Sequence, residues 1–150
     1  SPSARGGSTH SARSVAPLAL GLALVLLAAA SEAEVSDAAD PSRPFVVKIH
    51  ADWCGTCTRL NPVWQEIESG LGADARLVVL DVTDQERLAA SAALAERLGL
   101  GEFFARYKAR TGTVGVLRGD SREKVEVLKG VTDPARYQAA VARARGSDPS

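Results

Sequence analysis

The sequence has only two cysteines and no excess of charge of either sign. Two cysteines are too few for the disulfide network of a small secreted scaffold and too few for a zinc site closed by four thiolates. Eighteen Lys and Arg side chains balance eighteen Asp and Glu side chains. This balance argues against a nucleic-acid-binding protein and against binding to membranes through a polybasic surface. The length of 150 residues is about that of one domain.

Charged residues are absent from residues 15–30, VAPLALGLALVLLAAA, which follow a basic stretch with Arg5 and Arg13. A basic start, an apolar stretch of about 7–15 residues and an exit of small residues are typical of a secretory signal peptide. The alternative is a retained membrane anchor, although 16 residues fall short of the roughly 20 that span a bilayer. We therefore predict an exported protein, periplasmic or extracellular, with a signal peptide at 1–33, or with an anchor at 15–30.

Strand and helix patterns alternate in the rest of the chain. Residues 34–44 contain two prolines among small polar residues and indicate a linker; residues 45–146 form the predicted domain, and 147–150 a tail. Apolar, β-branched runs predict strands at 45–50, 76–82, 113–117 and 124–129. Apolar residues at helical spacing predict helices at 57–69, 84–98 and 134–145, with further helical turns at 102–109. The core order β-α-β-α-β-β-α predicts an α/β fold, a central mixed β-sheet flanked by helices.

The two cysteines, Cys54 and Cys57, are separated by Gly55 and Thr56 and lie between a predicted strand and a predicted helix. This is the arrangement of a redox-active pair. The free N–H groups and the dipole at a helix N-terminus favour an anion, so we expect a lowered thiol pKa for Cys54. The thiolate is the attacking species in disulfide exchange. Cys54 is therefore the predicted nucleophile, and Cys57, one turn further on, the predicted resolving thiol.

A metal site is the alternative for the same residues. With His50, the two cysteines supply three soft ligands, which suit monovalent copper. A closed zinc site would need a fourth ligand. The predicted redox pair needs no metal, whereas the alternative is a binding module whose cysteines and His50 hold copper.

The segment ADWCGTC at 51–57 resembles the Trp-Cys-Gly-Pro-Cys active site of the thioredoxin family. Pro62 stands where the family has its helix-kinking proline, and Gly130 where it has a glycine after the last strand. The resemblance runs from about Phe45 to Arg145 and implies a thioredoxin fold. It also implies a protein-disulfide oxidoreductase that uses no bound cofactor. Together with the export signal, it resembles the periplasmic thioredoxin-like proteins.

The family usually has a cis-proline opposite its active-site disulfide, but residues 63–133 contain no proline. Gly112 stands nearest that place. We expect a trans peptide there, because a non-proline cis bond costs roughly 2.5–4 kcal/mol. We also expect Gly112 to lie within van der Waals reach of Cys57.

Lys48 is the second departure, since thioredoxins carry a buried acid at this place. A buried ammonium must pair, reach solvent or lose its proton. One interpretation is that Lys48 tunes the thiols, as a cation that favours thiolate or as a proton acceptor for Cys57. The other is a solvated lysine paired with Asp81 on the neighbouring strand.

Three aromatic residues, Phe103, Phe104 and Tyr107, lie in a segment longer than the family usually has. Their spacing predicts core packing, and the alternative is a partner-binding lip beside the active site. At the active site, Trp53 is expected to cover the cysteines, and the Thr56 hydroxyl is a candidate hydrogen-bond donor to a thiolate.

These patterns predict thiol–disulfide exchange with disulfide-containing or dithiol exported proteins. We expect a reductant, since Gly55 resembles reductase-like members, and an oxidant is the alternative. A reductant outside the cytoplasm needs a membrane redox partner to recycle its dithiol. We expect no nucleic-acid partner, and a monomer.

Overall fold

The computed structural model describes residues 40–146. The predicted signal peptide at 1–33, linker residues 34–39 and the tail at 147–150 lie outside the described residues. None of the helices formed by residues 40–146 has the length and apolar character needed to span a bilayer.

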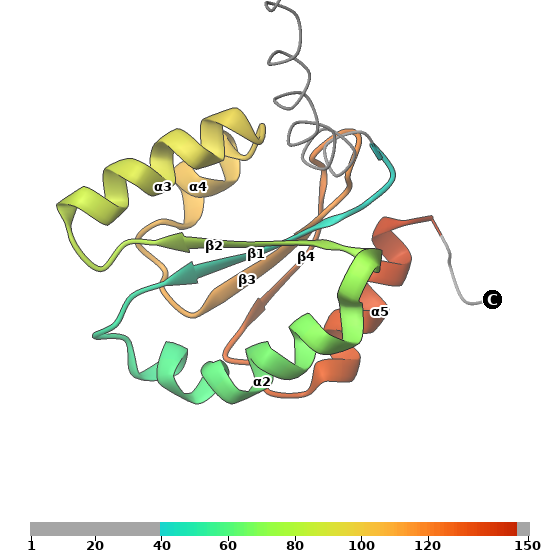
Figure 1. The fold of residues 1–150 in the computed structure, drawn as a ribbon, viewed down its shortest axis with the longest axis horizontal. Helices are drawn as coiled ribbons and strands as arrows, with labels where there is room; N and C mark the ends of the chain where they lie inside the picture. Colours follow the sequence, from blue (N-terminus) through green and yellow to red (C-terminus); the bar gives the residue numbers. More distant parts are fainter. Residues whose placement is uncertain (1–39, 147–150) are drawn as a thin grey trace, which may run out of the picture.

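Four strands form one mixed sheet in the order β2-β1-β3-β4: β1 (Phe45–His50), β2 (Arg76–Asp81), β3 (Thr113–Leu117) and β4 (Lys124–Lys129). β1 is parallel to β2 and antiparallel to β3, which is antiparallel to β4. The helices are α2 (Gly55–Leu71), α3 (Gln85–Arg97), α4 (Gly101–Tyr107) and α5 (Pro134–Ala144), with a short 3-10 turn, η1 (Gly72–Asp74). Figure 1 shows α2 and α5 on one face of the sheet and α3 and α4 on the other. The predicted α/β fold with a mixed sheet is confirmed.

β1 contributes side chains to a hydrophobic core on each face, because successive side chains of a strand point to opposite sides. Val46 packs with residues of α2 and α5, including Leu60 and Tyr137. Val47 and Ile49 pack with residues of α3 and α4. All five side chains are fully buried or nearly so. β1 is therefore the strand on which both layers of helices rest, and its end is held firmly.

Side-chain caps fix where the helices begin. The Asp84 carboxylate accepts a hydrogen bond from the backbone N–H of Arg87 and opens α3 where the sequence predicts. Asp133 caps α5 in the same way. α2 starts at Gly55, two residues before the predicted start, because the sulfur of Cys54 acts as its cap. The first cysteine thus lies at the helix N-terminus.

The aromatic residues of α4 belong to the core. Phe103, Phe104 and Tyr107 are all buried and pack under β1 and β3. The prediction of core packing is confirmed, and the alternative of a partner-binding lip is wrong. The reason is that α4 turns all three rings toward the sheet, which leaves none for a partner.

The Gly115→Ala variant is expected to unfold more easily by about 1–3 kcal/mol. A Cβ at Gly115, in the middle of β3, would collide with the ring of Phe103. That ring is 6% exposed and has little space to move. Urea unfolding of the variant and the parent chain gives the difference in free energy.

Gly70→Ala is the matched control for Gly115→Ala. A Cβ at Gly70, inside α2, meets only the terminal amide of Gln138, at 3.1 Å, and a flexible side chain moves away. Because glycine is unfavourable inside a helix, this variant is expected to gain about 0.5–1 kcal/mol. Equal stability of the two variants would contradict the packing of Phe103 against β3.

Candidate active site

The two cysteines lie where β1 ends and α2 begins. The Cys54 sulfur accepts a hydrogen bond of 3.3 Å from the backbone N–H of Cys57, and the Cys57 thiol is 3.8 Å from the carbonyl oxygen of Ile49. Cys54 is 8% exposed and Cys57 is fully buried. Both are free thiols. Only Cys54 is therefore open to attack a second molecule.

The surroundings shift the pKa values of the two thiols in opposite directions. Burial acts to raise the pKa of Cys54, but hydrogen bonds from the thiol of Cys57, from the side chain of Thr111 and from the backbone N–H groups of Cys57 and Thr56 outweigh it. The pKa of Cys54 therefore lies below its ordinary value. Burial raises the pKa of Cys57, and the hydrogen bond to Cys54 raises it further. Cys54 is thus the more readily formed thiolate, as the sequence predicts.

Alkylation of the reduced chain should separate the two cysteines by pH. The unshifted pKa of a cysteine thiol is 9.0. We expect the rate at which Cys54 reacts with iodoacetamide to rise with pH along a curve whose midpoint lies below this value. Cys57 should react along a curve displaced above pH 9.0 and more slowly, since it is buried. The curves are displaced in these directions because the thiolate is the form that reacts, and a thiol with a lowered pKa is present as thiolate at lower pH. Mass spectrometry of the two peptides measures both curves, and coincident curves would contradict the assignment.

Gly112, just before β3, approaches the active site as predicted. A Cβ at Gly112 would lie 2.6 Å from Thr56 Cγ2 and 3.8 Å from Cys54 Sγ. The N–H of Gly112 and the thiol of Cys57 both contact the carbonyl oxygen of Ile49. Gly112 has φ of 79°, and its N–H donates to the carbonyl of Ile49. Only glycine fits readily, because both the backbone angle and the space exclude a side chain.

Sequence reasoning missed Thr111, whose side chain acts to lower the pKa of the Cys54 thiol. No spacing or composition signal points to it, since it is distant in sequence and comes near only through the pairing of β1 with β3. Thr56 differs from expectation too. Its hydroxyl accepts from Arg59, and its methyl group packs toward Gly112 and Gly130. The Thr56 hydroxyl is thus paired with Arg59, and its methyl group fills the space between the two glycines.

Lys48 is buried beneath the cysteines, with 3% of its surface exposed. Its Nζ donates to Asn61 Oδ1 at 3.0 Å and lies 5.2 Å from the centre of the Trp64 ring. Burial lowers the pKa of Lys48, while the negative charges of Cys57, Glu68 and Cys54 act to raise it. The alternative of a solvated lysine paired with Asp81 is wrong, because α2 covers Lys48.

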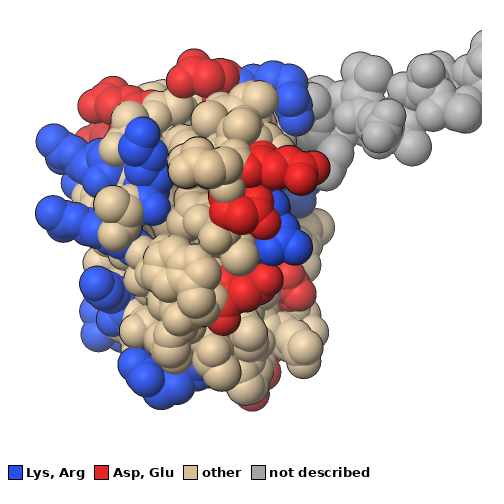
Figure 2. Space-filling model, turned by 90° about the vertical axis from the view of Figure 1, so that its left-hand side faces the viewer, with Lys and Arg blue, Asp and Glu red and all other residues tan. Residues whose placement is uncertain are grey.

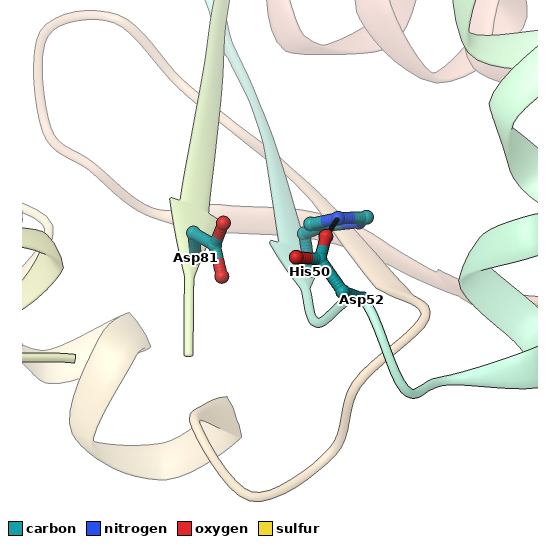
Figure 3. A group of neighbouring side chains, drawn as sticks. All are labelled: His50, Asp52 and Asp81. Carbon is teal, nitrogen blue, oxygen red and sulfur yellow. Dashed lines mark hydrogen bonds and ion pairs between the residues drawn. The ribbon is translucent and has the colours of Figure 1, made fainter. Parts of the chain in front are cut away.

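Asp81 instead lies with His50 and Asp52 at the carboxyl ends of β1 and β2 (Figure 3). His50 Nε2 lies 3.1 Å from Asp52 Oδ1. Arg87 lies 3.2 Å from Asp52 and 3.9 Å from Asp81 and supplies positive charge to the group. Within residues 40–146, this is the one set of three ligand-type residues whose atoms come together, and it contains neither cysteine. His50 thus groups with two carboxylates and not with Cys54 and Cys57.

The loop before the cysteines is tied to the loop between β2 and α3. Thr83 is the common partner, since its hydroxyl accepts from the N–H of Asp52 and its carbonyl accepts from the Trp53 indole. Trp53 is 67% exposed. The expectation that Trp53 covers the cysteines is replaced by a ring that is held at its N–H and faces solvent. Asp52 is exposed and paired with His50 and Arg87.

Figure 2 faces the end of the molecule to which the β1 and β2 arrows of Figure 1 point. A mostly uncharged band runs down its middle, with most of the Lys and Arg on the left and most of the Asp and Glu on the right, where some Lys or Arg atoms also lie. The cysteine pair, at the end of β1, thus lies at an end with an uncharged centre.

Residues 24–96 match the family model described as thioredoxin. The match contains both cysteines, begins within the apolar run at 15–30 and ends before Gly112. No curated protein matches the chain.

Three similar solved structures are Trxlp from Edwardsiella tarda, the germline-specific thioredoxin Deadhead from Drosophila melanogaster, and MTB dsbF. Trxlp is 19% identical, with 71% of this chain and 89% of that chain covered and a TM-score of 0.45. Deadhead is 20% identical, with 74% of this chain and 88% of that chain covered and a TM-score of 0.47. MTB dsbF is 15% identical, with 69% of this chain and 81% of that chain covered and a TM-score of 0.48. The family match contains both cysteines, and the sheet and helices around them have the arrangement of a thioredoxin fold.

Proposed function

We propose that the chain is a thiol–disulfide oxidoreductase that reduces disulfides of exported proteins through Cys54 and Cys57. The observation that carries this proposal is the opposite displacement of the two thiol pKa values within one pair at a helix N-terminus. A nucleophile needs a lowered pKa, and a resolving thiol should stay protonated until the first step is over. The match of residues 24–96 to the thioredoxin model supports the same reaction class.

The reaction has two exchange steps. The Cys54 thiolate attacks one sulfur of the substrate disulfide, a mixed disulfide forms, and the other substrate sulfur leaves as a thiolate that takes a proton from water. Cys57 then loses its proton to solvent and attacks Cys54 Sγ. The Cys54–Cys57 disulfide forms, and the second substrate thiolate leaves. Two electrons pass from the cysteine pair to the substrate, so a membrane redox partner must return two.

Substrate docking is supported by the uncharged band at the end of the molecule to which β1 points (Figure 2). Trp53 offers an exposed ring whose position is fixed by its hydrogen bond to Thr83. A held aromatic side chain binds a partner with little loss of conformational freedom. We propose that a segment of the substrate near its disulfide lies on this band, beside Trp53.

Oxidation of exported dithiols is the second candidate, and Lys48 favours it. A cation buried near the thiols stabilises thiolate over disulfide, which makes a pair more oxidising. The reduction potential separates the two directions. A reduction potential of about −270 mV indicates a reductant, and one of about −120 mV indicates an oxidant.

The test is catalysis of insulin disulfide reduction by the full chain, with dithiothreitol as electron source. We expect precipitation of the insulin B chain to accelerate in proportion to the protein added. The chain alkylated at both cysteines is the control and should be inactive. An unalkylated, folded chain without effect on insulin would overturn the proposal. The mass of the protein recovered from the producing cell tests the proposed export, since cleavage near residue 33 removes the apolar run.

A further inference from the structure

Lys48 is the one Lys, Arg, Asp or Glu among residues 40–146 whose side chain is buried. Its two contacts are neutral, the amide oxygen of Asn61 at 3.0 Å and the face of the Trp64 ring. A hydrogen bond and a ring face solvate an ammonium group but do not neutralise it. The remaining compensation must come from negative charges near it.

The negative groups that face Lys48 all belong to α2 and its cap: Cys57, Glu68 and Cys54. Glu68 is exposed, so water screens its charge. The thiols are buried, and the influence is mutual, because Lys48 lowers the pKa of Cys57. Asn61, which accepts the hydrogen bond from Lys48, lies one turn after Cys57 in α2, so the ammonium is on the face of the helix that carries this thiol. The thiolate of the reduced pair is thus the counter-charge of Lys48 inside the protein.

We propose that Lys48 sets the redox balance of the Cys54–Cys57 pair, its buried ammonium stabilising the reduced, thiolate-bearing form against the neutral disulfide. The inference rests on the proposed function, since it concerns the same pair. When the disulfide forms, the thiolate charge disappears, and the ammonium keeps Asn61, Trp64 and the screened charge of Glu68. The oxidised state therefore loses an attraction that the reduced state has. Lys48 makes the pair a stronger oxidant than it would otherwise be.

The test is the equilibrium of the full chain with glutathione, in which the protein disulfide and two glutathione thiols give the protein dithiol and one glutathione disulfide. For Lys48→Met, which has similar volume and no charge, we expect the constant to shift about tenfold toward the protein disulfide. Tenfold corresponds to 29.6 mV for a two-electron couple. The thiolate absorbance of Cys54 should titrate about one pH unit higher. Lys48→Arg, which keeps a charge, should retain most of the parent value.

Lys124→Met is the matched control, because it removes an amine far along the sheet. Lys124 pairs with Leu117 at the end of β3 opposite Thr113 and donates to the Tyr107 hydroxyl. Its removal should leave the glutathione equilibrium unchanged. A shift as large as that of Lys48→Met would show a nonspecific charge effect and overturn the inference.

Asn61→Asp keeps Lys48 in place and sets a carboxylate against its ammonium. Its expected effect is a shift in the same direction as Lys48→Met, since the thiols then face a neutral pair. If both variants fold and keep the parent constant, the inference is wrong while the proposed function stands. If the cysteines of the parent chain do not equilibrate with glutathione, the proposed function fails first. If a variant loses insulin reduction but its glutathione equilibrium constant is shifted as expected, the inference is supported. The equilibrium constant reports on the cysteine pair itself and does not depend on the insulin reaction.

Discussion

The Cys57→Ser variant is expected to accumulate as a mixed disulfide through Cys54, whereas Cys54→Ser forms none. Cys54 is partly accessible and has the lowered pKa, so it still attacks a substrate disulfide when Cys57 is absent. Without the second thiol, the mixed disulfide has no internal route to resolution. In Cys54→Ser, the remaining thiol is fully buried and its pKa is raised. Its exchange should be slower by on the order of 1000-fold or more.

Glutathione disulfide and insulin serve as substrates, and intact-mass spectrometry measures the adducts. The Cys54→Ser/Cys57→Ser double variant gives the background. Equal trapping by the two single variants would show that the roles are not divided between the thiols. Trapping by Cys54→Ser alone would reverse the assignment of nucleophile and resolving thiol.

Gly112→Val is expected to slow disulfide exchange by about 100-fold, the loss that a displacement of about 1 Å causes at a reacting centre. A Cβ at Gly112 lies 2.6 Å from Thr56 Cγ2 and 3.8 Å from Cys54 Sγ. A β-branched residue is also strained at φ of 79°. The backbone must move, and with it Thr111, which donates to Cys54. The pKa of Cys54 should therefore rise as the rate falls.

Gly146→Val separates backbone strain from crowding at the site. Gly146 has φ of 77°, and a Cβ there meets nothing within 4 Å. It lies after α5, and its variant should lose stability but keep the exchange rate of the parent chain. Rates from single-turnover reaction with insulin, compared at equal folded fraction, decide the matter. A Gly112→Val variant as fast as Gly146→Val would show that the close approach has no role in the reaction.

The elements of this fold were predictable because local signals and burial agree. Residues 45–50 form β1 as predicted, because a β-branched, apolar run that follows Pro44 strongly favours a strand. Asp84 and Asp133 begin their helices because their carboxylates cap them. The cysteine pair was predictable from its spacing and its place between strand and helix.

The environment of the pair was not predictable, because it depends on contacts that are distant in sequence. A lysine at position 48 is compatible with a buried place beside the thiols and with a solvated place on the sheet. Which of the two applies depends on how α2 lies over β1. Thr111 reaches Cys54 only because β3 pairs with β1. Sequence alone places Gly112 near the cysteines. Which of the two thiols lies nearer to it depends on differences of a few ångströms, which sequence patterns do not determine.

The pairing of β1 with β3 has a consequence for the newly made chain. Cys54 and Cys57 are synthesised early, on the β1–α2–β2 half, whereas Thr111 and Gly112 are made more than 50 residues later. Until β3 docks, the nucleophile lacks its donor from Thr111, and its sulfur is uncovered. The full lowering of the Cys54 pKa is thus a property of the finished molecule. In a chain that is still emerging, Cys57 and the N–H of Thr56 act on the nucleophile without Thr111, and full reactivity is reached only when the two halves have come together.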